Sequence, residues 1–101
     1  MTLAEFEHSL VQREPPSGLS TALTGLWWAG KDKWDKAHEV VMNEDSADCA
    51  WVHGYLHRLD GDLANARYWY RLAKRKPAEG EQATEWTAIV AALLDSAPVR
   101  D

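Results

Sequence analysis

Histidine and cysteine are the residues of this chain whose types and spacing could do chemistry. Cys49, His53 and His57 follow one another at intervals of four residues. On a helix with 3.6 residues per turn such positions fall on nearly one line. Thiolate and imidazole are ligands of Zn²⁺, and two histidines at i and i+4 can chelate one ion. The spacing therefore raises a metal or small-molecule site as one interpretation.

The length of a helix limits which of these residues can act together. With a rise of about 1.5 Å per residue, Cys49 and His57 lie about 12 Å apart along the axis. They are too far apart for both to bind one zinc ion at about 2 Å. Only a neighbouring pair can chelate, so a third ligand must come from another helix. His38 is the obvious donor, with Asp35 or Glu39 behind it.

The candidate ligand or metal site therefore consists of His38, His53 and His57, and a divalent metal is the one cofactor considered. No HExxH motif is present, because Gly54, Tyr55 and Leu56 stand between the two later histidines. The competing interpretation is structural: these histidines hydrogen-bond backbone carbonyls or Tyr hydroxyls between helices. Spacing alone does not decide between the two.

Cys49 and His53 could instead form a nucleophile and its base. Cys49 stands in the first turn after Ser46, where the helix dipole lowers a thiol pKa. No orienting third group can be named, however, and a small buried thiol is the alternative. GxGxxG, GxxxxGK and GxSxG are all missing from the sequence. We therefore name no catalytic residue, and the sequence favours a protein that is not an enzyme.

A helical hairpin over residues 46–76 must position the later histidines. Ser46 is a good N-cap for its first helix, which closes at Leu59. Gly61 can adopt the left-handed conformation that ends a helix, and Asp62 can cap the next one. Pro77 stops the second helix. The predicted apolar face of that helix comprises Leu63, Ala66, Tyr70 and Ala73, with Trp69 beside it.

The hairpin resembles a tetratricopeptide-type repeat. Gly54, Gly61, Ala66, Tyr70 and Ala73 stand at the spacings where these repeats place small residues, the turn glycine and an aromatic between the helices. The segment GDxxxAxxWYxxA also looks like the Sel1-like variant. Histidines replace the usual leucine and tyrosine in the first helix. The wider string AH, WVH, LHR, GD, NA and YWY is similar to that of short uncharacterised all-helical proteins, a resemblance that implies no function.

An internal duplication extends this architecture to the first half of the chain. A shift of 29 residues aligns Gly25 with Gly54, and Ala37 with Ala66. We predict an all-α domain over residues 1–101, with hairpin one at about 19–42 and hairpin two at about 47–76. A helix from Thr2 to about Gln12 and a capping helix at about 79–95 flank them. The capping helix is predicted to bury Ala83, Trp86, Val90 and Leu93.

The resemblance also implies an interaction surface. In tetratricopeptide-like arrays the first helix of each hairpin lines the concave face, which would place Trp51, Tyr55 and Arg58 in a groove. Aromatic residues and arginine dominate recognition hot spots, and arginine pairs with carboxylates. The leading expectation is therefore a small interaction module of tetratricopeptide type that binds a peptide or protein, with an acidic or C-terminal peptide the sensible class. The site built from His38, His53 and His57 is the alternative function. Alternatively, Trp51 packs against a neighbouring helix and Arg58 pairs with Asp60 or Asp62.

Composition limits the classes of partner and the cellular compartment that we expect. A net charge of -5 argues against a nucleic-acid partner. A single cysteine fits a reducing compartment, and no apolar run reaches the ~20 residues of a membrane span. We therefore expect a cytoplasmic protein with no membrane partner. A homodimer is a further expectation if Trp27, Trp28 or Trp86 is exposed.

Overall fold

A computed structural model describes residues 1–96, with side chains to residue 95, and these residues contain helices and no strand. The all-α prediction is confirmed. The six helices are α1 (Leu3–Ser9), α2 (Thr21–Gly30), α3 (Trp34–Met42), α4 (Ala47–Leu59), α5 (Leu63–Leu72) and α6 (Gln82–Ser96). Proline 98 and the tail after it lie outside the described residues.

Polar caps set the start of most helices. Thr2 and Glu5 form the predicted capping box, and the hydroxyl of Ser46 accepts a hydrogen bond from the Cys49 amide. Gly61 has φ +81°, the left-handed turn expected between α4 and α5, and Asp62 caps α5. The predicted bounds were wrong by a few residues elsewhere: α2 begins after a Ser20 cap rather than at residue 19, α1 ends at residue 9, and α6 begins at residue 82.

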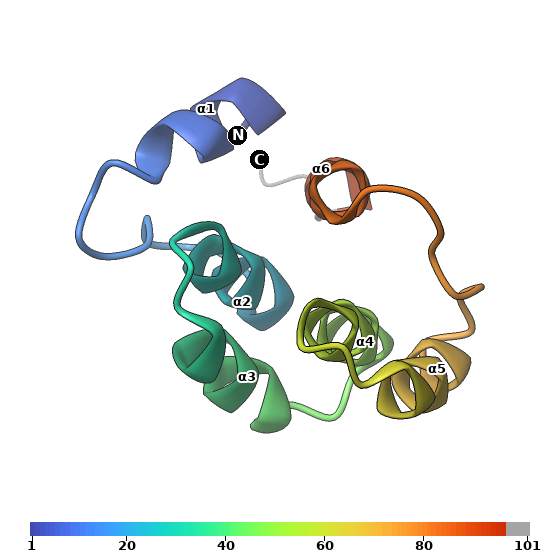
Figure 1. Ribbon diagram of the computed structural model, residues 1–101. Helices are drawn as coiled ribbons and strands as arrows, with labels where there is room; N and C mark the ends of the chain where they lie inside the picture. The colour runs from blue at the N-terminus through green and yellow to red at the C-terminus, as the bar shows by residue number, and fades with distance from the viewer. Residues whose placement is uncertain (97–101) are drawn as a thin grey trace.

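Two helical hairpins, α2 with α3 and α4 with α5, form the lower part of Figure 1 and pack side by side through α3 and α4. Each hairpin crosses at a glycine of its first helix. A Cβ built on Gly25 would lie 2.5 Å from Val41 Cγ1, and one built on Gly54 would lie 3.0 Å from Tyr70 Cδ1. The same shift of 29 residues relates Val41 to Tyr70, so each glycine contacts the equivalent residue on the second helix of its hairpin.

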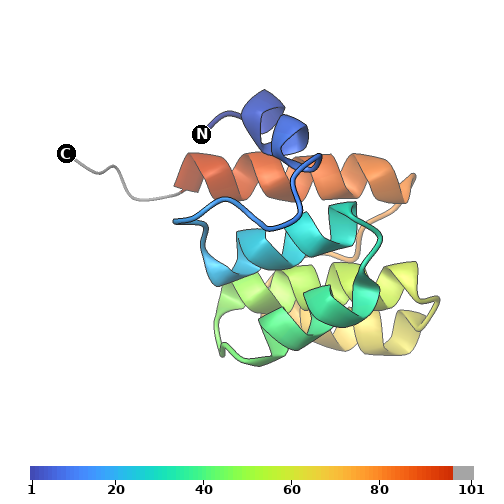
Figure 2. The ribbon, with the colours of Figure 1, turned by 90° about the vertical axis from the view of Figure 1, so that its left-hand side faces the viewer.

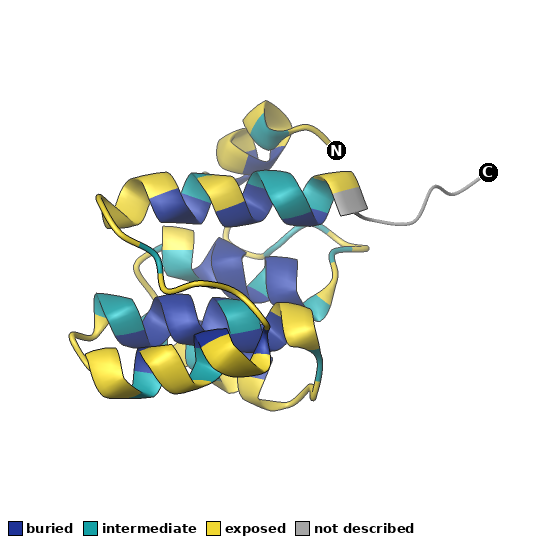
Figure 3. Cartoon of the chain, turned by 90° about the vertical axis from the view of Figure 1, so that its right-hand side faces the viewer, coloured by how far each residue is buried: buried dark blue, intermediate teal, exposed yellow. Residues whose placement is uncertain are grey.

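The sixth helix covers the other side of the first helix of each hairpin. Figure 2 shows α6 running across α2, with α1 lying over it, and Figure 3 shows buried residues on the facing sides of α2, α4 and α6. Trp86 Nε1 donates to the Leu26 carbonyl at 2.8 Å, and Trp27 Nε1 donates to Ser9 Oγ at 3.0 Å. These buried indole contacts join α1, α2 and α6 into one core.

Parts of the predicted faces need correction. Leu63 is 55% exposed and Ala83 is exposed, because each stands in the first turn of its helix, beyond the reach of the neighbouring element. Ile89 was not predicted and is fully buried. The three tryptophans proposed as an exposed dimer surface, Trp27, Trp28 and Trp86, are all buried. That surface does not exist, although a homodimer itself stays a prediction.

No helix within residues 1–96 combines the length and apolar character needed to cross a bilayer.

Candidate metal centre

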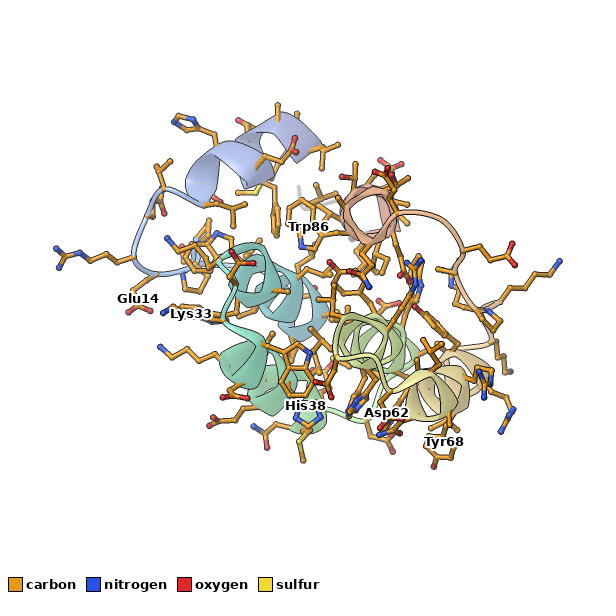
Figure 4. The ribbon with its side chains drawn as sticks, in the orientation of Figure 1. Glu14, Lys33, His38, Asp62, Tyr68 and Trp86 are labelled. Atoms are coloured by element: carbon orange, nitrogen blue, oxygen red, sulfur yellow. The ribbon has the colours of Figure 1, made fainter. Side chains whose placement is uncertain are left out.

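The structure brings His38, His53 and His57 together between the two hairpins. His38 comes from α3, and the other two come from successive turns of α4. One ring nitrogen from each lies within 4.8 Å of those of the other two. We call these three residues the histidine cluster. Figure 4 shows the His38 side chain between α3 and α4.

The three rings contact one another directly. The Nε2 atoms of His38 and His53 are 2.9 Å apart, so in the metal-free state one ring carries its hydrogen on Nε2 and the other offers a lone pair. The rings of His53 and His57 stack with centroids 4.9 Å apart. Within residues 1–96 none of the cluster rings hydrogen-bonds a backbone carbonyl or a Tyr hydroxyl. The contacts therefore differ from those of the structural interpretation.

Aromatic side chains on the flanking helices hold these rings in place. Trp34 stacks on His38 with centroids 4.7 Å apart, and its Nε1 donates to the Leu56 carbonyl at 2.7 Å. Trp69 of α5 stacks on His53 at 3.8 Å. Sequence reasoning gave neither tryptophan a role at the site. The missed signal is a pair of ring or amide residues at i and i+4 on each of three successive helices: Trp34 with His38, His53 with His57, and Asn65 with Trp69.

One nitrogen of the cluster is buried without a partner. His57 is 8% exposed, and its Nδ1 has no hydrogen-bond partner. Its Nε2 lies 3.3 Å from the side-chain amide nitrogen of Asn65. Amide orientation is interchangeable, so Asn65 can equally present Oδ1 to accept from Nε2–H. The Nδ1 lone pair is then free, which is the arrangement of a metal-binding histidine held by a second hydrogen bond.

The electrostatics favour the uncharged form of two rings of the cluster, His38 and His53. Burial, followed by the neighbouring His38 and His57, lowers the pKa of His53 to about 4. The pKa of His38 is also lowered, by burial first and then by His57, while Asp35 and Asp60 act against the shift. Neutral imidazole is the form that binds a metal. The lowered pKa of His38 and of His53 therefore favours their ligand form at neutral pH.

The spacing suits a transition metal. Two nitrogens at about 2.05 Å from a tetrahedral zinc ion lie about 3.3 Å apart. The separation of 2.9 Å between the Nε2 atoms of His38 and His53 is already near that value. The widest separation in the cluster, up to 4.8 Å, has to close by about 1.5 Å.

A pocket of about 540 Å³ borders the cluster. Its walls come from the end of α3, the connection to α4, the start of α4 and the end of α5, and His53 and Trp69 are among its lining residues. We call it the α3–α5 pocket. Of the histidine cluster, His53 alone lines it.

Cys49 takes no part in the cluster. Its side chain is 1% exposed, and burial raises the thiol pKa to about 11. The expectation that the helix dipole would lower this pKa is wrong, because desolvation and the nearby Glu44 carboxylate outweigh the dipole. The alternative, a small buried thiol, matches the structure.

The residues predicted to line a concave groove lie beneath α6. Tyr55 is 5% exposed, and Arg58 forms an ion pair with Glu85 of α6 at 2.8 Å and donates to the Gly80 carbonyl. Trp51 borders a pocket of about 330 Å³, where the guanidinium of Arg75 lies 3.8 Å from its ring centroid. The expected open groove is thus wrong for Tyr55 and Arg58, because α6 packs across that face of α4. Partner binding itself stays a prediction.

None of the family models, curated proteins or solved structures compared with this chain matches it. The interpretation of the site therefore rests on its own geometry.

Proposed function

We propose that this protein binds one divalent transition-metal ion, Zn²⁺ being the best match, through His38, His53 and His57. The observation that supports this most is the buried His57 Nδ1, which has no hydrogen-bond partner. An unpaired buried polar atom costs about 1–3 kcal/mol, and coordination of a metal would remove that cost.

Three imidazoles on two helices form a donor set typical of zinc. In this proposal His38 and His53 bind through Nε2, and His57 binds through Nδ1 with Asn65 as its outer partner. Both Nε2 atoms need a lone pair for the ion, so the ring that carries the shared hydrogen on Nε2 would carry it on Nδ1 instead and stay neutral. The ion would also connect the two hairpins.

Calorimetric titration of Zn²⁺ into the purified protein tests the proposal. We expect one equivalent of Zn²⁺ to bind. The His57→Ala variant should bind Zn²⁺ more than about 10-fold more weakly, because even the loss of a residue that hydrogen-bonds a metal ligand costs about 10-fold in affinity. His8→Ala is the matched control, since His8 is exposed on α1 and lies outside the cluster. Circular dichroism checks that each variant is folded. The absence of binding, or equal affinity in the His57→Ala variant, would contradict the proposal.

A second candidate is an interaction module with a tetratricopeptide-like arrangement. The repeated glycine crossings at Gly25 and Gly54 support that arrangement. The pocket at Trp51 supports a peptide partner, because Arg75 and Lys76 line it and offer positive charge to an acidic ligand. Glu79 and Glu85 line it too, and Glu85 is paired with Arg58. In this second candidate, Arg75 and Lys76 take the role that was predicted for Arg58, because Arg58 is paired with Glu85.

Fluorescence anisotropy of a labelled acidic peptide tests the second candidate. We expect Arg75→Ala to weaken binding several-fold, because it removes the charge over the Trp51 ring. Lys36→Ala is the control, since Lys36 makes the same kind of contact with Trp28 at 4.2 Å, away from this pocket. Equal affinity in both variants would refute the Trp51 site.

A further inference from the structure

The described part of the chain supplies three ligands for a metal that takes four. Among histidine, cysteine, aspartate and glutamate in residues 1–96, the group of converging donors contains only the histidine cluster. Asp35 and Asp60 act on His38 through their charge, but neither belongs to that group. Zinc is usually four-coordinate, and a three-ligand site keeps its fourth position for a molecule from outside. This step rests on the proposed function.

The α3–α5 pocket gives that molecule a place beside the cluster. Its volume of about 540 Å³ lies within the range of small-molecule sites, about 300–1,000 Å³. His53 connects the two features, because its ring contacts His38 in the cluster and its residue lines the pocket. Trp69 lies against the same ring, nearly parallel to it at 12°, and also lines the pocket.

The walls of the pocket indicate the class of ligand. Val41, Ala50 and Leu72 present apolar surface, which favours an apolar or aromatic body. Glu44 and Asp45 also line the pocket, and both are exposed. Carboxylates of like sign disfavour an anion at this position. An uncharged nitrogen donor avoids that repulsion and matches the three imidazole ligands already present.

We propose that the α3–α5 pocket binds an uncharged aromatic nitrogen heterocycle of the imidazole class, whose ring nitrogen takes the fourth position on the ion bound by the histidine cluster. The remainder of the ligand lies along Leu72 and Trp69. The free molecule, rather than a protein segment, is the occupant, because the pocket holds a body of small-molecule size.

The test uses the protein loaded with Co²⁺, whose visible bands report coordination. We expect both imidazole and 4-phenylimidazole to change the bands, with 4-phenylimidazole binding about 10-fold more tightly because its phenyl ring leaves water. Sodium azide, an anion, should bind more weakly than either. Total cobalt measured after gel filtration shows that the metal stays on the protein.

A matched pair of leucines on α5 locates the binding. Leu72 is 50% exposed and lines the pocket, whereas Leu63 is 55% exposed and does not. Leu72→Asp should abolish the 10-fold preference for 4-phenylimidazole, and Leu63→Asp should retain it.

Three results would overturn the inference while the metal site stands: bands unchanged by either heterocycle, equal affinity for the two heterocycles, or tighter binding of azide. An absence of cobalt bands before any ligand is added would overturn the metal site and this inference together. The two failures are therefore distinguishable.

Discussion

Three neighbouring side chains determine the surroundings of the His53 ring. Trp69 covers one face of the ring, His57 stacks near it, and His38 meets its Nε2 atom. None of these neighbours supplies a negative charge, so nothing compensates the loss of water around a protonated ring. That is the physical reason why its pKa falls to about 4.

This lowered pKa predicts a loss of stability in mild acid. Below pH 6.5 the unfolded chain takes up a proton at His53, but the folded protein resists it down to about pH 4. Stability of the metal-free protein should therefore fall across that window as pH decreases, by up to about 1.4 kcal/mol per pH unit. Urea unfolding at pH 7 and pH 5 measures the change.

The control for this prediction is His53→Gln, which removes the titrating group. Its stability should change less between the two pH values than that of the wild type. An equal change in both proteins would show that other groups, such as His38, carry the pH dependence.

At the residue scale, the sequence predicted which histidines lie close together, but it did not predict their hydrogen bonds or the burial of Cys49. Intervals of four placed His53 and His57 on one face of a helix, and the search for a third donor led to His38. The partnerless His57 Nδ1 and the Asn65 contact could not be predicted, because they depend on the rotation of α5 about its own axis. The same limit explains the error at Cys49, whose burial depends on packing.

At the scale of elements, each hairpin depends on the absence of a side chain at one crossing. Gly25 and Gly54 allow the second helix of each hairpin to approach closely, so that Val41 and Tyr70 fill the space above them. Sequence spacing predicted these crossings because the small residues recur at a fixed shift. Helix ends were harder to predict, since they depend on which hydroxyl caps which amide, as Ser20 does in α2.

This packing predicts that Gly25→Ala destabilises the protein. The new Cβ would meet Val41 Cγ1 at 2.5 Å, and overpacking of this kind costs about 1–3 kcal/mol. Denaturant unfolding measures the loss. The double variant Gly25→Ala/Val41→Ala removes the clash, so the added alanine should cost less in a Val41→Ala background than in the wild type. A cost that is the same in both backgrounds would contradict the proposed contact.

At the scale of the whole molecule, α6 decides which faces stay open. It buries Trp86, Ile89 and Val90, and it carries the Glu85 that pairs with Arg58 and accepts from the Tyr70 hydroxyl at 2.5 Å. The sequence predicted a capping helix in this region but placed a binding groove on the face that α6 covers. Periodicity shows that a helix has an apolar face, and it does not show which neighbour that face covers.

The side of α4 that α6 does not cover contacts α3 and α5, and there the histidine cluster connects the hairpins. A metal at this position would tie α3 to α4, so it should stabilise the whole fold rather than one helix. Binding to the folded state alone adds about 2.7 kcal/mol when free metal is 100 times its Kd.

Thermal unfolding with Zn²⁺ and with a chelator tests this account most directly. For a domain of this size the stabilisation corresponds to a rise in Tm of roughly 10–20 °C. We predict that rise for the wild-type protein and little or none for the His57→Ala variant. An identical Tm for the wild type in Zn²⁺ and in chelator would contradict the metal centre.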